Sequence, residues 1–136
     1  MVKKTRTVLL VEDSPSQAEA YKGYLAKEPI NVVHVLTGED AVGWLDHSVP
    51  DVILLDLQLP GIHGLEVLKQ VVARELPSPV VVITDDGSVN VAVEAMRAGA
   101  FDFVTKPFGA SRLKVTVANA IRQEELSDLV DAYRET

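Results

Sequence analysis

Residues that could transfer a phosphoryl group stand at the ends of four apolar runs in this sequence. Glu12 and Asp13 follow the run VLLV, and Asp56 closes the run VILLD. Thr84 closes VVVIT, and Lys106 follows FVT. Continuous apolar runs are typical of parallel strands buried on both faces, and ligands bind at the carboxyl ends of such strands. We therefore expect these five side chains to meet at one edge of a sheet.

The three carboxylates predict a site for a divalent cation. At about 4 Å and an effective dielectric near 20, each pair of charges would repel by roughly 4 kcal/mol. Mg²⁺ would relieve this repulsion, because it takes oxygen ligands and prefers one or two carboxylates together with phosphate. One acidic residue after a strand is equally well explained as the start of a surface loop. All three together favour a Mg²⁺ site with Glu12, Asp13 and Asp56 as ligands.

Asp56 is the residue that we expect to act as nucleophile. A carboxylate that attacks phosphorus forms an acyl phosphate, which is a covalent route open to Asp. The metal and Lys106 would neutralise charge on the transferring phosphoryl group, and the Thr84 hydroxyl could donate to one of its oxygens. Taken singly, Thr84 is better explained as a β-branched strand residue, and Lys106, before Pro107, as an exposed lysine in a turn.

The pattern of the chain predicts five strand–helix units and hence an α/β fold. Strands that alternate with helices form a parallel sheet with helices on both faces. We expect strands at about 7–11, 31–36, 51–55, 80–84 and 101–105. The first helix should run to about Lys27 and the second to about Ser48, and the fifth should start near Ala110 and be long.

Local signals mark the helix ends. Ser14 is expected to be the N-cap of the first helix, with Pro15 at its first position and Gln17 completing a capping box. Gly99 is expected just beyond the end of the fourth helix, and Met96 in the core. The three histidines have no metal-like spacing, so we expect them on the surface or in loops.

Composition excludes several classes of protein. The 136 residues suffice for one domain with a substantial core, and 13 basic against 20 acidic residues give a net charge of −7. A basic surface for nucleic acid is therefore not expected. The absence of cysteine excludes disulfides and fits the cytosol. The first apolar run reaches Glu12 at once, unlike a signal peptide or membrane span. We expect a cytoplasmic protein that contacts neither membrane nor nucleic acid.

The motifs VLLVEDS, VILLDLQLPGIHG, VVVITD and FVTKPF, in this order, resemble the receiver domain of two-component response regulators. The resemblance covers about residues 6–123. It implies the doubly wound, flavodoxin-like strand order 2-1-3-4-5. It also implies that Asp56 is the phospho-acceptor, that Glu12 and Asp13 are the family's acidic pair, and that the backbone carbonyl of Gln58 is a further Mg²⁺ ligand.

The same resemblance implies a switch, a peptide geometry and a partner. Thr84 and Phe103 fall at the family's switch positions, although Phe103 is equally well explained as a packed strand aromatic. The bond between Lys106 and Pro107 is expected to be cis. The phosphoryl donor would be a sensor histidine kinase or a histidine phosphotransfer protein. The chain would be no enzyme beyond catalysing its own phosphorylation and dephosphorylation.

Two residues beside the expected site, Asp85 and Gln58, could affect the rates of phosphorylation and dephosphorylation. Asp85 stands where the family usually has a small residue. Its charge should repel an incoming phosphoryl group and slow phosphorylation; the alternative is that the loop turns its side chain outward. The side-chain amide of Gln58 could position or block the water that removes the phosphoryl group.

Two segments indicate a branch of the family. Ile83 to Phe108 resembles receivers of the nitrogen-regulator (NtrC) class, whose members activate transcription with the alternative sigma factor, sigma-54. Ser111 to Gln123 is most similar to the LuxO-type quorum-sensing branch. We therefore expect a receiver domain at 1–123 that regulates transcription. Residues 124–136 would form a C-terminal helix extension or the start of a linker to output domains.

The fifth helix carries two apolar stripes that point to nearly opposite sides. One stripe can pack on the sheet, and the other needs a different partner. A frayed tail is the alternative; pairing with a second copy, giving a homodimer, is the reading we favour. The stripes are Leu113, Val117 and Ile121, and Leu126, Leu129, Val130 and Tyr133.

Two other functions share parts of this pattern. A Mg²⁺-dependent phosphatase of the haloacid-dehalogenase type also uses an Asp nucleophile, but it would want an acid two residues later, where this chain has Gln58. A flavodoxin-like cofactor binder would want a phosphate-cradling loop after the first strand, and that loop is acidic here. A phospho-accepting signalling module is the function that we favour.

Overall fold

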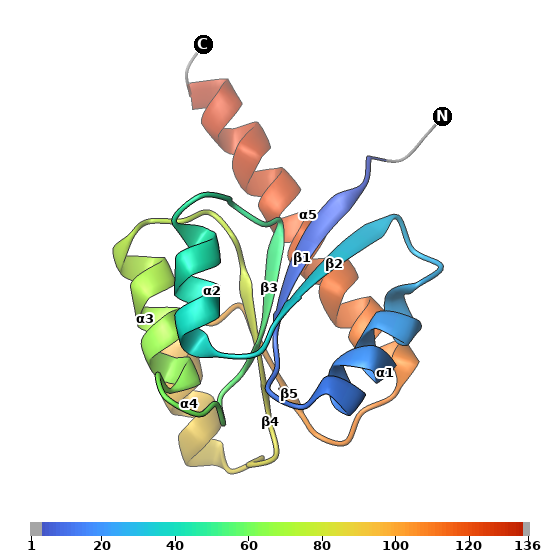
Figure 1. Cartoon of the computed structure of the whole chain (residues 1–136). Helices are drawn as coiled ribbons and strands as arrows, with labels where there is room; N and C mark the ends of the chain where they lie inside the picture. The colour runs from blue at the N-terminus through green and yellow to red at the C-terminus, as the bar shows by residue number, and fades with distance from the viewer. Residues whose placement is uncertain (1–3, 135–136) are drawn as a thin grey trace.

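A computed structural model describes residues 4–134 as a five-stranded parallel sheet between two layers of helices (Figure 1). The strands lie in the order β2-β1-β3-β4-β5. They are β1 (Arg6–Val11), β2 (Ile30–Val35), β3 (Val52–Asp56), β4 (Val80–Thr84) and β5 (Asp102–Thr105). The helices are α1 (Pro15–Leu25), α2 (Gly38–Leu45), α3 (Gly64–Ala73), α4 (Val89–Arg97) and α5 (Ala110–Arg134). The expected doubly wound fold and its strand order are confirmed.

Each face of the sheet has its own hydrophobic core. Alternate side chains of a strand point to opposite faces, so Leu9 packs toward α2 and α3 whereas Leu10 packs toward α1 and α5. The central strands β3 and β4 are buried along their whole length. This double burial explains why their sequences are apolar without interruption.

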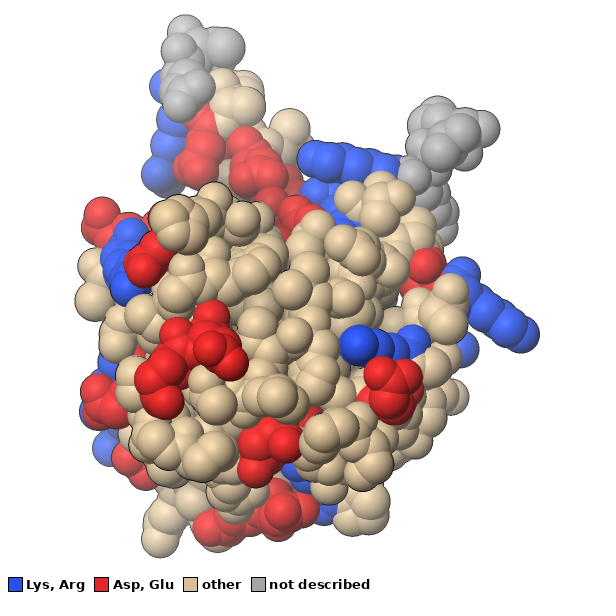
Figure 2. Space-filling model, in the orientation of Figure 1, with Lys and Arg blue, Asp and Glu red and all other residues tan. Residues whose placement is uncertain are grey.

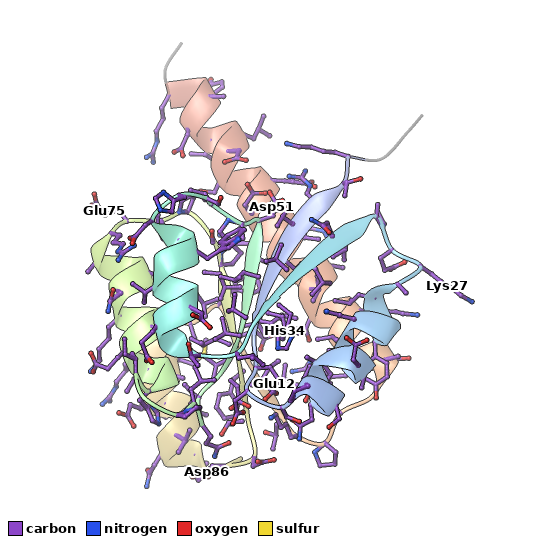
Figure 3. All side chains as sticks on the ribbon, in the orientation of Figure 1. Glu12, Lys27, His34, Asp51, Glu75 and Asp86 are labelled. Carbon is purple, nitrogen blue, oxygen red and sulfur yellow. The ribbon has the colours of Figure 1, made fainter. Side chains whose placement is uncertain are left out.

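The register of the strands brings their carboxyl ends to one edge. Asp56 pairs with Ile83 across β3 and β4, and Thr84 pairs with Thr105 across β4 and β5. Glu12 and Asp86 lie at this edge in Figure 3, and Asp51 lies at the opposite edge. The sheet therefore assembles residues that are up to 94 positions apart in the chain.

Helix caps follow the local sequence signals, with one exception. Ser14 is the N-cap of α1, with Pro15 in the first turn, and Gly99 follows α4 with φ +111. The expected capping box is wrong in its second half, however. The Ser14 N–H donates to the Glu12 carboxylate at 3.1 Å and not to the side chain of Gln17. The side chain of Gln17 therefore makes no capping hydrogen bond and can contact another residue.

Several other boundaries and placements differ from expectation. Helix α1 ends at Leu25 and α2 at Leu45, each about two or three residues early. Met96 is 47% exposed, because the buried stripe of the short α4 is narrow and centres on Ala95. His34 lies within β2, where it is half-buried and its Nε2 is 2.7 Å from the Glu12 carbonyl oxygen.

Helix α5 continues unbroken to Arg134 and projects beyond the body of the domain (Figure 1). Arg6, at the start of β1, holds the base of this projection. Its guanidinium lies 3.2 Å from Glu124 and 2.7 Å from Glu125, and it is also 3.5 Å from Asp51. Burial and neighbouring Asp128 raise the pKa of Glu124 to about 7. Within residues 4–134, none of the helices has the length and apolar character that crossing a bilayer requires.

The start of α3 allows no side chain at Gly64. A Cβ atom there would meet the Asp56 carbonyl oxygen and would lie 2.6 Å from Leu57 Cα. Gly64→Ala should therefore lower the free energy of unfolding by about 1–3 kcal/mol, as overpacking does. Gly43→Ala is the matched control, because a Cβ there meets nothing within 4 Å. Within a helix it should raise stability by roughly 0.5–1 kcal/mol. Urea denaturation measures both, and equal effects of the two substitutions would contradict the expected clash.

Candidate functional site

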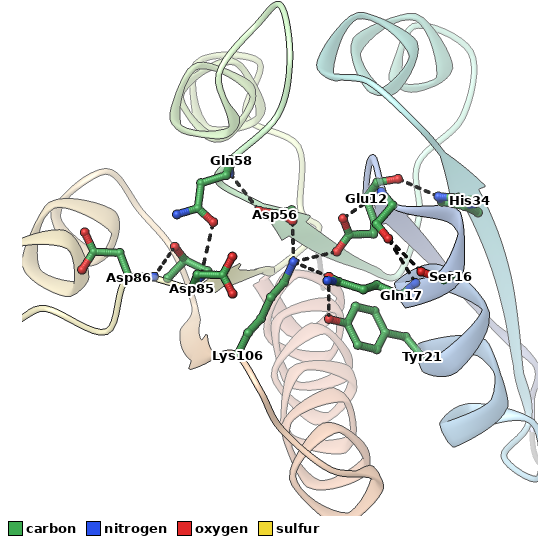
Figure 4. A network of polar contacts seen from close by, with 12 residues as sticks. Glu12, Ser16, Gln17, Tyr21, His34, Asp56, Gln58, Asp85, Asp86 and Lys106 are labelled. Atoms are coloured by element: carbon green, nitrogen blue, oxygen red, sulfur yellow. Dashed lines mark hydrogen bonds and ion pairs between the residues drawn. The ribbon is translucent and has the colours of Figure 1, made fainter.

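Lys106 lies between two buried carboxylates at the carboxyl edge of the sheet (Figure 4). Its ammonium nitrogen, Nζ, is 2.7 Å from Asp56 Oδ2 and 3.0 Å from Glu12 Oε1. Glu12 follows β1, Asp56 ends β3 and Lys106 follows β5. The topology of the sheet therefore brings together three of the residues that the sequence singled out.

Backbone groups hold the two carboxylates in place. The Gln58 N–H donates to Asp56 Oδ1 at 2.8 Å, and the Ser14 N–H donates to Glu12 Oε2 at 3.1 Å. Each carboxylate thus has one oxygen fixed by the loop that follows its strand and one oxygen on Lys106. Charged acceptors form the stronger hydrogen bonds, so this arrangement fixes the site before any ligand enters.

One ammonium pairs with two carboxylates, and burial opposes this pairing in setting the protonation of Glu12. Burial raises the pKa of Glu12 to about 7, although the hydrogen bonds from Lys106 and Ser14 act in the opposite direction. Burial acts to lower the pKa of Lys106, but its bonds to Asp56 and Glu12 outweigh this and raise it. Lys106 therefore stays charged, and Glu12 is a carboxylate that can take up a proton near neutral pH.

The three predicted carboxylate ligands lie close enough for one metal ion. Glu12, Asp13 and Asp56 each offer an oxygen, and these oxygens lie within 4.8 Å of one another. Asp13 is exposed, whereas Glu12 and Asp56 are buried. An all-oxygen donor set with one open side suits Mg²⁺, which keeps several waters. These residues therefore fit the expected ion.

Two backbone N–H groups of the loop after β4 donate hydrogen bonds to side chains, one to Thr84 and one to Gln58. Thr84 is buried, and its Oγ1 accepts a hydrogen bond from the Asp86 N–H at 3.1 Å. The Asp85 N–H donates to Gln58 Oε1 at 3.3 Å. The amide of Gln58 thus bridges the loops after β3 and β4. The Asp85 side chain is exposed, and the predicted slowing of phosphorylation by its charge stays a prediction.

The strand-five end of the site has two further features. The Lys106–Pro107 peptide bond is cis. Phe103 is partly buried and packs against the core on the α2, α3 and α4 side of the sheet. Phe103 therefore has the packing role that the sequence allowed, while its role as a switch stays a prediction.

Sequence reasoning missed two contacts in this network. Gln17, in the first turn of α1, accepts a hydrogen bond from Lys106 Nζ at 2.6 Å. His34 reaches the Glu12 backbone from the neighbouring strand β2. A polar residue in the first helical turn beside an acidic loop was the available signal for Gln17, but it also fitted a capping box. No pattern indicated His34.

Acidic side chains are spread over the outer surface and include several near this edge. Figure 2 shows Asp and Glu at the lower margin, where the strands end in Figure 1. Most of the visible Lys and Arg lie along the upper and side margins. The buried ammonium of Lys106 is a single positive charge beside three clustered carboxylates, so a further cation is favoured there.

The sequence matches the family of response regulator receiver domains over residues 8–118. It is 48% identical over 114 residues to regulatory protein LuxO of Vibrio vulnificus, covering 84% of this chain and 25% of the relative. It is 41% identical over 91 residues to transcriptional regulatory protein FixJ of Bradyrhizobium diazoefficiens, covering 64% and 44%. The chain thus spans about a quarter of the length of the LuxO relative.

A solved structure gives the same result. The crystal structure of the signal receiver domain of a LuxO repressor protein from Vibrio parahaemolyticus superposes with a TM-score of 0.89 at 44% identity. The aligned region covers 92% of this chain and 96% of that one. Family match, relatives and superposed structure agree, and this chain belongs to the response regulator receiver domains of two-component systems, with clear similarity to those of the LuxO type.

Proposed function

We propose that this receiver takes a phosphoryl group onto Asp56 with Mg²⁺ bound beside it. The observation that carries the proposal is the position of Asp56, which is buried, is one of three clustered carboxylates and is 2.7 Å from the Lys106 ammonium. A nucleophile next to a fixed cation is favoured for attack on an anionic phosphoryl group.

The reaction forms a bond between an Asp56 carboxylate oxygen and phosphorus. The bond between phosphorus and the donor breaks, and the donor's leaving group keeps the electron pair and takes a proton. Lys106 balances charge on the transferred group. The Thr84 hydroxyl, whose oxygen accepts from the Asp86 N–H, has its own O–H to donate to one of the phosphoryl oxygens. Hydrolysis by water returns the free carboxylate.

The residues that would hold Mg²⁺ are Glu12, Asp13, Asp56 and the backbone carbonyl of Gln58. When bound, the ion neutralises negative charge among the carboxylates and the phosphoryl oxygens. In this proposal the chain catalyses only its own phosphorylation and dephosphorylation. The change at Asp56 then reaches Thr84 and Phe103, which act as the switch.

The chain would be cytoplasmic, its donor would be a sensor histidine kinase or histidine phosphotransfer protein, and the output would be transcription. The relatives LuxO and FixJ are named as regulatory proteins, and they are longer than this chain. Residues 1–123 would be the receiver, and 124–136 would begin the connection to an output domain that works with sigma-54. The net charge of −7 argues against nucleic-acid binding by this segment itself.

A homodimer would bring two C-terminal extensions together. Leu126, Leu129 and Val130 are exposed on α5, and they are between 47% and 66% accessible. The stripe covers only about two turns, too few for a stable pair alone. Exposed Val93 and Met96 on α4 offer further apolar area. Pairing about a two-fold axis is the commonest arrangement of soluble homo-oligomers.

Phosphorylation should depend on Asp56 and on a divalent ion. Incubated with acetyl phosphate and Mg²⁺, the wild-type chain should gain one phosphoryl group, detected by intact-protein mass spectrometry. Asp56→Asn should reduce labelling to background, because an amide oxygen is a far weaker nucleophile. Asp46→Asn, which removes an exposed carboxylate at the end of α2, is the matched control and should label normally. Labelling that survives Asp56→Asn, or that proceeds in excess chelator, would exclude this assignment.

Binding of Mg²⁺ should release protons near neutral pH. Because the pKa of Glu12 is raised to about 7, this carboxyl is protonated in part of the metal-free molecules at pH 7. Metal ligands must be deprotonated, so binding should release about half a proton at pH 7 and tighten between pH 6 and pH 8. Calorimetry in two buffers of different ionisation enthalpy measures this release.

The sign of the effect on stability follows from the same pKa. The folded chain keeps a proton on Glu12 that the unfolded chain loses above about pH 4.5. The metal-free protein should therefore lose stability as pH rises from about 4.5 to about 7.

Glu12→Gln should bind Mg²⁺ more weakly, with no proton release near pH 7. Equal release by wild type and Glu12→Gln would show that another group titrates.

The dimer should depend on the exposed stripe of α5. The double variant Leu126→Ser, Leu129→Ser should sediment as a monomer at high micromolar concentration, where the wild-type chain should show dimer. Leu36→Ser is the control, because Leu36 is 45% exposed just after β2 and lies on neither α4 nor α5. Sedimentation velocity with and without beryllofluoride measures the change. A wild-type chain that stays monomeric under both conditions would rule out the dimer.

A further inference from the structure

The ammonium group of Lys106 has three acceptors, and one of them is neutral. An ammonium has three N–H donors, and Nζ lies within 3.0 Å of oxygens from Glu12, Asp56 and Gln17. The shortest of the three distances, 2.6 Å, is to the Oε1 atom of Gln17 (Figure 4). The neutral acceptor, Gln17, therefore lies at least as close to the ammonium as either carboxylate does.

Gln17 is placed for this contact by its own helix. Its backbone N–H is capped by the Ser14 hydroxyl at 3.3 Å, which fixes the first turn of α1. Its side chain has no capping role, because Glu12 takes the Ser14 N–H instead. The Gln17 Oε1 atom also lies 3.4 Å from the Tyr21 hydroxyl, one turn further along α1.

A closed ring of contacts connects the first two turns of α1, from Gln17 to Tyr21, with the loop that carries Lys106. Tyr21 stacks on Phe108, with ring centroids 4.9 Å apart. Phe108 stands two residues after Lys106, so the ring of contacts runs from Lys106 to Gln17, to Tyr21, to Phe108 and back along the chain. The buried ring of Tyr21 anchors α1 to the loop after β5 by packing as well as by hydrogen bonds.

The neutral partner matters because the two charged partners are also the proposed metal ligands. Glu12 and Asp56 cannot offer the same oxygens to Lys106 and to a divalent cation without bringing two positive charges together. Like charges at this distance repel strongly. The Gln17 carbonyl is not among the clustered carboxylates, and it carries no charge that a cation would claim. Its hydrogen bond to Lys106 can persist when the carboxylates are engaged elsewhere.

We propose that Gln17 is a positioning residue that keeps the Lys106 ammonium beside Asp56 while the carboxylates bind the metal. The proposal rests on the roles proposed above for Asp56 and Lys106, and it adds a function for α1 in the reaction. Gln17 acts through Lys106 and does not touch the phosphoryl group.

The direct test observes the Lys106 ammonium by ¹H–¹⁵N NMR, with its signal assigned by Lys106→Arg. A hydrogen-bonded ammonium exchanges slowly with water, so the wild-type chain should give a signal alone, with Mg²⁺, and with Mg²⁺ and beryllofluoride. In Gln17→Met, which keeps length and helix propensity but removes the acceptor, the signal should be lost once Mg²⁺ is added. Gln17→Glu restores an Oε1 acceptor and should restore the signal.

Kinetics provide the second readout. Gln17→Met should lower the rate of acetyl-phosphate labelling at saturating Mg²⁺ by about tenfold or more, as expected for loss of a hydrogen bond to a charged group. Gln123→Met, the same change at an exposed position of α5, should leave the rate unaltered. The thermal unfolding midpoints of both variants should match the wild type, which shows that each is folded.

Three results would overturn the positioning role. The Lys106 signal could persist in Gln17→Met with Mg²⁺, it could be lost in Gln17→Glu as well, or labelling could be unchanged in Gln17→Met. In each case wild-type labelling at Asp56 would stand and only the role of Gln17 would fail. Labelling that survives Asp56→Asn would instead refute the proposed function itself.

Discussion

The ammonium of Lys106 offsets the mutual repulsion of the carboxylates in the site. Glu12 and Asp56 are buried within reach of one positive charge, and Asp13 adds a third carboxylate at the rim. Burying charge is costly unless it is paired. The central strands and their loops are thus arranged so that one lysine, from the far end of the chain, satisfies two acidic residues.

That single pairing explains the electrostatic character of the site. Burial raises the pKa of Glu12 to about 7 in spite of its bond to Lys106, while the bonds to Asp56 and Glu12 keep Lys106 charged. A second cation would neutralise the negative charge that Lys106 leaves on the three carboxylates, and this is the physical argument for the divalent ion proposed above. Its arrival would disturb the contacts of Lys106, and the neutral acceptor on α1 becomes important at that point.

The opposite edge of the sheet carries a different arrangement. Arg6 contacts Glu124 and Glu125, so β1 is joined to the base of the projecting part of α5. Strand β1 therefore links both ends of the molecule, because its carboxyl end leads into Glu12. The same strand thus contacts the base of the C-terminal extension through Arg6 and leads into the site through Glu12.

Sequence alone predicted the fold class, the strand order through family resemblance, and the four charged residues Glu12, Asp13, Asp56 and Lys106 that the sheet brings together. Uninterrupted apolar runs identify doubly buried strands, and residues such as Asp56 and Lys106 stand at their ends. Only the tertiary structure decided which partners these residues have. Gln17 fitted a capping box locally, yet its side chain contacts Lys106, 89 positions away. His34 and Met96 were misplaced for the same reason, because packing between distant elements sets the environment of a side chain, and no local pattern records it.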